Sequence, residues 1–251
     1  MTVQNEAKAV QTWDSCVYTA EEERDFVRDY LGPRLEKLGV KIMFWDHNKE
    51  RLYERAKVMY SDPRTAGYIY GSAFHWYSGD HFEQLAITAQ QYPDKKLIFT
   101  EGCQEYSKNV SESWLIGERY AHDMIGNFNH GCNAFTDWNL LLNEKGGPNH
   151  VSNFCDAPIL ADTSNDSFSF SNSYYYIGHF SKYIKPGAKR IAFSKYTDLL
   201  DACAFQNPDG DMVLILLNRT QEPRRLTVRL SGQLAELTAE PRSILTCLVR
   251  R

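Results

Sequence analysis

The chain has 251 residues, a formal net charge of −4 and 43% hydrophobic residues, which is enough apolar material for one large domain or two ordinary ones. Its 28 basic and 32 acidic residues are spread without a basic stripe, which argues against nucleic acid as a partner. No apolar stretch approaches the roughly 18 residues of a membrane span, and Met1 begins no charged-then-apolar signal segment.

The first part of the chain alternates between strand-like and helix-like segments. Segments rich in β-branched and aromatic residues predict five strands, at 2–6, 40–46, 68–76, 96–101 and 133–138. Helices are predicted between them at 19–38, where Thr19 and Glu22 make a capping box, and at 114–129. The strand ends recur about once per βα unit, which favours a parallel sheet with helical crossovers.

The pattern changes after Asn139. A helix-like run at 174–183 is followed by a region without long helical periodicity. Strands are predicted there at 190–194, 202–206, 212–218, 225–230 and 244–249. Residues 207–210, Asn-Pro-Asp-Gly, read as a hairpin turn, since acidic ligands at the spacing of a calcium loop do not follow. We therefore predict two domains, 1–186 with a β/α fold and 187–251 with an antiparallel β fold.

Cysteine usage predicts no metal or redox motif. The six cysteines are far apart and contain no C-x-x-C pair, so buried free thiols are the simplest interpretation. Three N-x-S/T sequons begin at Asn109, Asn165 and Asn218, which permits glycosylation but also arises by chance, so the compartment stays open.

The ends of the predicted β/α strands are polar, and in a parallel β/α barrel the carboxyl ends of strands form the functional face. They carry carboxylates, aromatic rings and amides with almost no Lys or Arg, which suits a neutral sugar better than a phosphate. Glu6 and Glu101 close the first and fourth of these strands and would face each other across a closed barrel. A retaining glycosidase needs such a carboxyl pair, although a single glutamate at a strand end is more often a solvated loop residue.

Several motifs in order resemble glycoside hydrolase family 30, most closely its glucosylceramidase branch. They are TVQNE at 2–6, FHWY at 74–77, FTE at 99–101, TDWN at 136–139, NEKGGPN at 143–149, NF at 153–154, GHFSK at 178–182 and LNR at 217–219. They span essentially the whole chain. The chain departs from the family at Ala7, where a proline is usual, and at Gly102, where a bulkier small residue is usual.

The resemblance implies an α/β plus all-β fold: strands 4 to 8 of a (β/α)8 TIM barrel and a C-terminal antiparallel β-sandwich. It places the acid/base at Glu6 and the nucleophile at Glu101 of a double displacement without metal or other cofactor. The negative charge nearby is expected to raise the pKa of Glu6.

The resemblance also implies substrate-binding roles around the two glutamates. Asn5 would bind the sugar 2-hydroxyl, and His75 and Tyr77 would lie near Glu101 and keep its carboxylate ionised. The remaining implied sugar or aglycone contacts are Asp137, Trp138 and Asn153. The roles of three residues stay undecided. Trp13 would either contact the aglycone or pack against the protein, and Asp46 and His47 would either contact the aglycone or cap a helix.

The resemblance places Met1 directly before the fourth barrel strand, so strands one to three are expected to be supplied elsewhere. We expect the chain to belong to a longer protein, to pair with an N-terminal fragment or to self-associate through open barrel edges. The expected substrate is a β-glucoside or a glycosphingolipid reached at a membrane surface, in a secreted or lysosomal compartment. The alternatives are a β-1,6-glucanase, a xylan-active enzyme, or an inactive fragment that binds sugar or lipid.

Overall fold

A computed structural model describes residues 1–105, 110–149 and 151–250. Two compact units, each described by itself, make up the chain. The first unit comprises residues 1–103, 126–138 and 149–153, and the second comprises 104–125, 139–148 and 154–251. Each unit is made of three separate segments of the chain, and one boundary between the units falls inside the long helix at Val110–Asn129.

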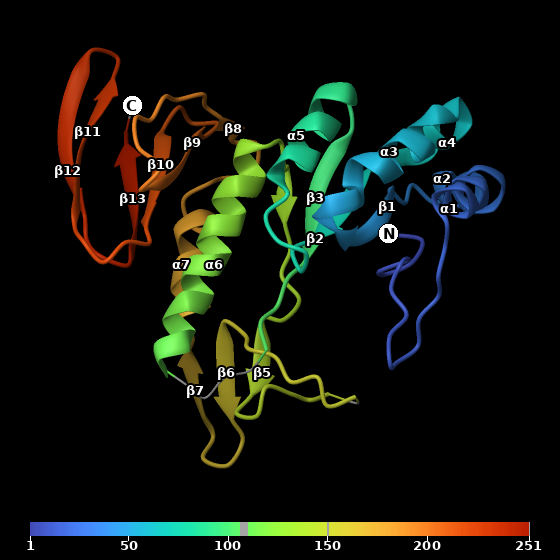
Figure 1. Ribbon diagram of the computed structural model, residues 1–251, viewed down its shortest axis with the longest axis horizontal. Helices are drawn as coiled ribbons and strands as arrows, with labels where there is room; N and C mark the ends of the chain where they lie inside the picture. The colour runs from blue at the N-terminus through green and yellow to red at the C-terminus, as the bar shows by residue number, and fades with distance from the viewer. Residues whose placement is uncertain (106–109, 150, 251) are drawn as a thin grey trace. The chain divides into compact units, whose positions relative to one another are not determined.

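The first unit is built on a four-stranded parallel sheet in the order β1-β2-β3-β4. Figure 1 labels its first three strands. Its strands are β1 (Ile42–Asn48), β2 (Ile69–His75), β3 (Lys96–Glu101) and β4 (Ala134–Phe135). Since the strands are parallel, their carboxyl ends share one edge of the sheet. The predicted β/α arrangement is confirmed, and β3 has the predicted bounds.

Helices precede β1 and connect the strands that follow it, as the sequence pattern predicts. They are α1 (Ala20–Phe26), α2 (Gly32–Glu36), α3 (Leu52–Ser61), α4 (Pro63–Tyr68), α5 (Phe82–Gln91) and α6 (Val110–Asn129). The Thr19–Glu22 capping box forms, with the Thr19 hydroxyl accepting from the Glu22 amide at 3.1 Å. A π turn at Val27–Leu31 joins α1 to α2, so the helix predicted at 19–38 is one interrupted helical run.

Three of the predicted strands are much shorter than expected. The strand predicted at 133–138 is reduced to β4 (Ala134–Phe135), and the one predicted at 190–194 is reduced to β8 (Lys189–Arg190). In 2–6 only Thr2 pairs with the sheet, through an isolated parallel bridge to Met43. The chain then turns at residues 5–8, with Glu6 in the left-handed region at φ 50°. This turn ends the strand pairing and directs the Glu6 side chain back toward β1, whose Asp46 carbonyl accepts from the Glu6 amide at 2.8 Å.

Large aromatic side chains fill the core of the first unit behind the carboxyl ends of the strands. Phe74, Trp76 and Phe99 are at most 2% exposed, and the rings of Phe99 and Phe135 stack with centroids 4.3 Å apart. The departure at Gly102 follows from this packing, because a Cβ there would lie 2.7 Å from Phe99 and 2.9 Å from Trp76. The polar residues at the strand ends therefore stand on a rigid apolar layer.

The second unit contains the antiparallel β region. Its main sheet has the order β13-β10-β9-β8, and β11 pairs with β12 in a separate hairpin (Figure 1). The bounds are β8 (Lys189–Arg190), β9 (Asp201–Gln206), β10 (Met212–Asn218), β11 (Arg224–Leu230), β12 (Gln233–Ala239) and β13 (Ser243–Val249). The β-sandwich prediction is confirmed, and the turn at 207–210 joins β9 to β10 as expected. The structure adds β12, which the sequence analysis did not predict.

A second, smaller sheet in this unit was not predicted either. It consists of β5 (Leu141–Asn143), β6 (Ile159–Asp162) and β7 (Ser167–Phe170). The predicted helix at 174–183 forms as α7 (Asn172–Ser181). In the part of α6 that belongs to this unit, Gly117 lies directly against Tyr176 of α7, where a Cβ would approach the Tyr176 ring to 2.6 Å.

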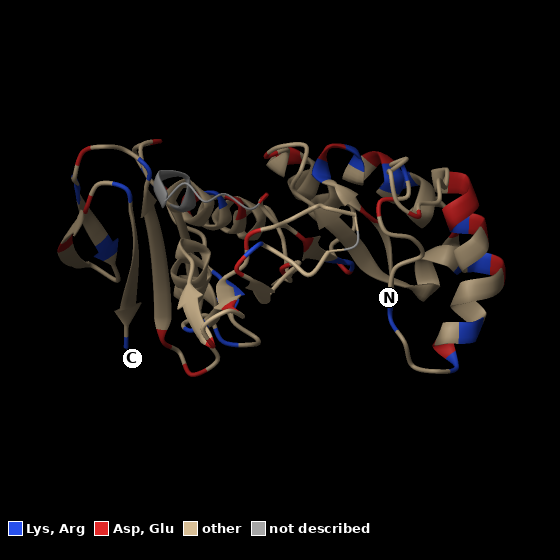
Figure 2. Cartoon of the chain, turned by 90° about the horizontal axis from the view of Figure 1, so that it is seen from below, with Lys and Arg blue, Asp and Glu red and all other residues tan. Residues whose placement is uncertain are grey.

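Acidic and basic residues are interspersed along the chain (Figure 2). Within the described residues, no helix has the length and apolar character needed to cross a membrane.

The domain boundary at 186/187 stays a prediction.

Candidate active site

Three strand ends of the first unit bring their last polar residues together. Asp46 is near the end of β1, His75 ends β2 and Glu101 ends β3, while Glu6 joins them from the turn after Thr2. The register of β1 against β2 shifts between Trp45 and His47, and Trp45 and Asp46 have positive φ values of 78° and 49°. This bulge directs Asp46 toward His75, and left-handed geometry in two adjacent non-glycine residues is costly enough to need support.

The support comes from Glu23 on α1, which is fully buried. Its carboxylate accepts the Trp45 amide at 3.0 Å and lies 3.7 Å from Arg55, whose guanidinium stacks 4.6 Å from the Trp45 ring. Burial raises the pKa of Glu23 to about 7, against the lowering effects of that hydrogen bond and of Arg55. The buried Glu23 carboxyl group therefore holds the bulge in shape through its hydrogen bond to the Trp45 amide.

His75 is the centre of the cluster and is fully buried. Its Nδ1 donates to Glu6 Oε1 at 3.2 Å, and its Nε2 donates to Asp46 Oδ1 at 3.1 Å. Nε2 also lies 3.7 Å from Glu101 Oε2. Burial alone would lower the pKa of His75, but the hydrogen bonds to Asp46 and Glu6 and the charge of Glu101 raise it to about 9. The imidazole is thus protonated at neutral pH and links three carboxyl groups.

Asp46 fixes the orientation of His75. One Asp46 oxygen accepts the Thr2 hydroxyl at 2.6 Å, and the other accepts the Thr100 hydroxyl at 2.6 Å as well as the His75 proton. Burial raises the pKa of Asp46, and these hydrogen bonds outweigh it and hold the pKa low. Asp46 therefore holds His75 and does not cap the helical turn that follows β1, whose N-cap is Asn48; its contact with an aglycone stays a prediction.

Tyr77 positions Glu101. The Tyr77 hydroxyl donates to Glu101 Oε1 at 3.0 Å and lies 3.5 Å from Cys103 Sγ. Burial and the Glu101 charge raise the pKa of the Tyr77 phenol, so the hydroxyl keeps its proton and remains a donor. Tyr77 and His75 therefore lie beside Glu101 as expected, but the expectation that they keep its carboxylate ionised is wrong, because burial raises the pKa of Glu101 to about 7.

The protonation of the two glutamates differs from the expectation. Burial would raise the pKa of Glu6, but the hydrogen bond and charge of His75, the charge of His47 and a bond from Gln11 lower it below its ordinary value. Burial raises the pKa of Glu101 to about 7, despite the opposing effects of His75 and Tyr77. The prediction of a raised Glu6 pKa is wrong for the resting structure, because His75 donates its hydrogen bond to Glu6 and not to Glu101.

His47 lies on the accessible side of the cluster. Its Nδ1 is 3.7 Å from Glu6 Oε1, and burial lowers its pKa despite the charge of Glu6. Gln11 donates to the other Glu6 oxygen at 2.8 Å. The sequence left His47 undecided and missed Gln11, Thr2 and Thr100. Only Thr100 gave a signal, since it directly precedes Glu101 at a strand end.

The remaining predicted substrate contacts lie on loops of the first unit. The Trp138 amide donates to the Gly102 carbonyl at 3.3 Å, which places the loop of Asp137 and Trp138 beside the end of β3. Trp138 is 54% exposed, as a wall of an open sugar site would be. Asn5 is exposed in the turn before Glu6, Asn153 is exposed in a loop with Asn149, and Trp13 is 38% exposed. Their contacts with a sugar stay predictions.

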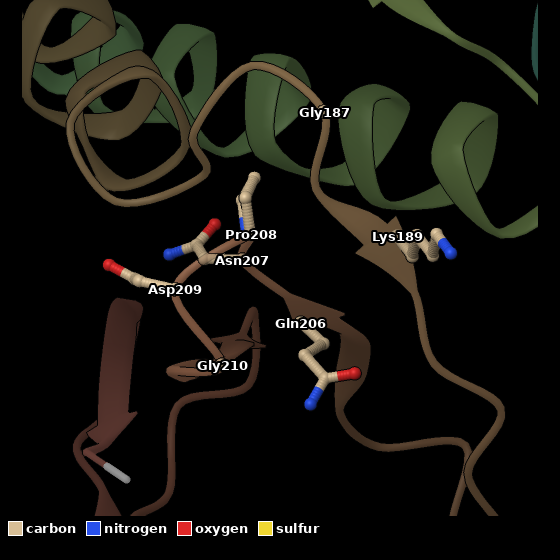
Figure 3. Close-up of a pocket in the computed structure, with 7 residues that line it drawn as sticks. All are labelled: Gly187, Lys189, Gln206, Asn207, Pro208, Asp209 and Gly210. Carbon is tan, nitrogen blue, oxygen red and sulfur yellow. The ribbon is translucent and has the colours of Figure 1, made fainter.

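A separate pocket of about 280 Å³ belongs to the second unit, beside the turn of Asn207–Gly210 (Figure 3). Its one carboxylate, Asp209, forms an ion pair with Lys185. This pocket therefore lacks the neighbouring carboxyl groups that the cluster around His75 provides.

A β/α sheet that gathers carboxylates at its strand ends, followed by a β-sandwich, defines a class of carbohydrate-active barrel proteins. Residues 2–184 match the glycosyl hydrolase family 30 TIM-barrel domain, and residues 187–247 match the glycosyl hydrolase family 30 beta sandwich domain. The chain belongs to glycosyl hydrolase family 30.

Its relatives include glucosylceramidases. The mouse lysosomal acid glucosylceramidase is 38% identical over 223 residues, covering 84% of this chain and 43% of the relative. Among solved structures, SrfJ from Salmonella typhimurium is 46% identical with a TM-score of 0.97, over all of this chain and 57% of that one. An endo-β1,6-glucanase structure is 29% identical with a TM-score of 0.86, over 98% of this chain and 56% of that one. The chain thus spans about half the length of the curated relatives it matches.

Proposed function

We propose that this chain carries the catalytic carboxylates of a retaining β-glucosidase whose substrate is glucosylceramide or a related β-glucoside. The observation that carries the proposal is the His75 cluster, in which one buried imidazole contacts both Glu6 and Glu101 while Tyr77 donates to Glu101. The glucosylceramide assignment draws on the glucosylceramidase relatives at 38% and 32% identity.

The proposed reaction is a double displacement. A Glu101 oxygen attacks the anomeric carbon, and Glu6 gives its proton to the glycosidic oxygen as the bond to the aglycone breaks. A water molecule then attacks the glucosyl–Glu101 ester, passes its proton to Glu6 and releases glucose with Glu101 free again. The aromatic face of Trp138 and the polar groups of Asn5, Asp137 and Asn153 are the proposed substrate contacts.

The reactive protonation state differs from the resting one only in where one proton sits. At rest the proton occupies Glu101, whose pKa is raised to about 7, while Glu6 is ionised. Attack by Glu101 needs that proton on Glu6. Both arrangements hold the same number of protons and belong to one coupled titration. His75 contacts both carboxyl groups, so its positive charge couples their titration.

This coupling predicts the pH dependence of the rate. As the pH rises through about 7, the glutamate pair loses its last proton, so kcat/KM for an aryl β-glucoside is expected to fall. The measurement is a pH–rate profile with two leaving groups, methylumbelliferone and dinitrophenol. The alkaline fall should be weaker for dinitrophenol, which leaves without protonation. A rate that increases through pH 7 for both substrates would contradict the shared proton.

The function itself is tested by hydrolysis of a fluorogenic β-glucoside by the purified chain in the presence of methanol. Methyl β-glucoside as the first product indicates retention. Methyl α-glucoside, or no turnover when the chain is combined with a recombinant N-terminal half that supplies strands one to three, would reject the proposal. The parallel substrates are glucosylceramide in detergent micelles and gentiobiose, a β-1,6-linked disaccharide. Preference for gentiobiose would favour the second candidate, a β-1,6-glucanase, which the 29% identical glucanase structure supports.

A further inference from the structure

The glutamate–histidine cluster also has the composition of a transition-metal site. Glu6, His47 and His75 each offer one ligand atom, and these three atoms lie within 4.8 Å of one another. Zn²⁺ binds nitrogen and oxygen ligands at about 2.0–2.2 Å, so tetrahedral ligands around it are separated by about 3.3 Å. Glu6 Oε1 already lies 3.2 Å from His75 Nδ1 and 3.7 Å from His47 Nδ1, so small side-chain movements would suffice.

A second observation concerns His47 Nδ1. This nitrogen is buried and has no hydrogen-bond partner among the residues that the structure describes, although it faces the Glu6 carboxylate. A buried polar atom without a partner is costly, and a ligand that fills the space between the two groups removes that cost. The side chains of Glu6 and His47 are each 13% exposed, which leaves a route of entry from solvent.

The surroundings of His75 complete the arrangement. With Nδ1 on a metal ion, His75 would still donate its Nε2 proton to Asp46, which lies 3.1 Å away and accepts from Thr2 and Thr100. A carboxylate behind a histidine ligand is the usual means of fixing that ligand in zinc proteins. A divalent ion would also bring positive charge to a cluster in which His75 lies within 4 Å of three carboxyl groups, those of Glu6, Asp46 and Glu101.

We propose that Glu6, His47 and His75 form an inhibitory site for one Zn²⁺ or a similar borderline-soft divalent ion. The ion would displace the proton between His75 and Glu6 and so remove the group that protonates the leaving oxygen. Its binding depends only on the cluster, whereas its inhibitory effect rests on the proposed function.

The test begins with equilibrium dialysis of Zn²⁺ against the full chain, and with visible spectroscopy of Co²⁺, whose tetrahedral complexes absorb strongly. One ion per chain is expected. His47→Asn should weaken binding by on the order of 100-fold or more, and Asp46→Asn by about 10-fold. The matched control is His81→Gln, since His81 lies 3.6 Å from Glu83 in an exposed histidine–carboxylate pair of the same unit. His81→Gln should leave binding unchanged.

Equal Zn²⁺ binding by the wild type and His47→Asn, or the absence of saturable binding, would overturn the proposal. Thermal unfolding identifies a variant that fails to fold, in which case Asp46→Asn decides. Dialysis does not depend on turnover, so Zn²⁺ binding would keep the metal site even if the hydrolysis experiment with the N-terminal half rejected the proposed function. For an active protein, Zn²⁺ should inhibit hydrolysis, and EDTA should reverse the inhibition.

Discussion

Replacing Glu101 with alanine is expected to lower kcat for an aryl β-glucoside by on the order of 10⁴- to 10⁶-fold, the range for losing a member of a catalytic unit. Added azide should restore turnover and give α-glucosyl azide, because azide attacks from the face that the carboxylate vacated. Glu6→Ala should instead retain reaction with a dinitrophenyl glucoside, whose leaving group needs no proton. Azide should then yield β-glucosyl azide by attacking the glucosyl–Glu101 ester in place of water.

This pair of variants decides between the two possible role assignments. The family resemblance makes Glu101 the nucleophile, while the resting pKa order, low for Glu6 and about 7 for Glu101, would by itself favour the reverse. The anomer of the azide product, read by NMR, separates them. β-Glucosyl azide from Glu101→Ala and α-glucosyl azide from Glu6→Ala would show that the roles are exchanged.

Replacing His75 with asparagine is expected to impair both activity and stability. Without the imidazolium, Glu6, Asp46 and Glu101 lose the positive charge that all three contact, and removing one partner of a buried ion pair costs roughly 3–5 kcal/mol. The hydrogen bond that His75 donates to Glu6 is lost as well, so kcat should fall by about 10²- to 10³-fold, the usual cost of removing one preorganised donor.

The stability loss should depend on pH in a defined direction. The folded-state pKa of His75, about 9, lies above its ordinary value of 6.5, so its contribution is fully present below pH 6.5 and is lost as the pH rises through 9. Denaturant unfolding of the wild type and His75→Asn should therefore differ most near pH 6 and least above pH 9. His81→Asn, an exposed histidine, is the control. A difference that grows toward pH 9 would refute the charge-balancing role.

The sequence correctly predicted those elements whose local sequence pattern favours the same structure as their packing in the fold. Strand β3 and the Thr19 capping box formed as expected, because alternation and capping chemistry act over a few residues. Segment 2–6 did not form a full strand, because its residues favour a strand but the turn at Glu6 is set by contacts with β1. Strand β12 was missed because all but two of its residues are exposed, so it shows little apolar alternation.

For the candidate site, the sequence by itself identified the two glutamates and two of the side chains beside them. Strand-end position and the family motifs identified Glu6, Glu101, His75 and Tyr77, since parallel strands place their carboxyl ends at one edge of the sheet. The sequence could not determine which of these groups are protonated, because a pKa depends on the neighbouring buried groups. Glu6 and His75, for example, form a hydrogen bond although they are 69 residues apart in the chain. Only the tertiary structure placed Asp46 behind His75, with the Thr2 and Thr100 hydroxyls on its oxygens. Contacts between distant segments decide the charge balance of the cluster, and no local pattern records them.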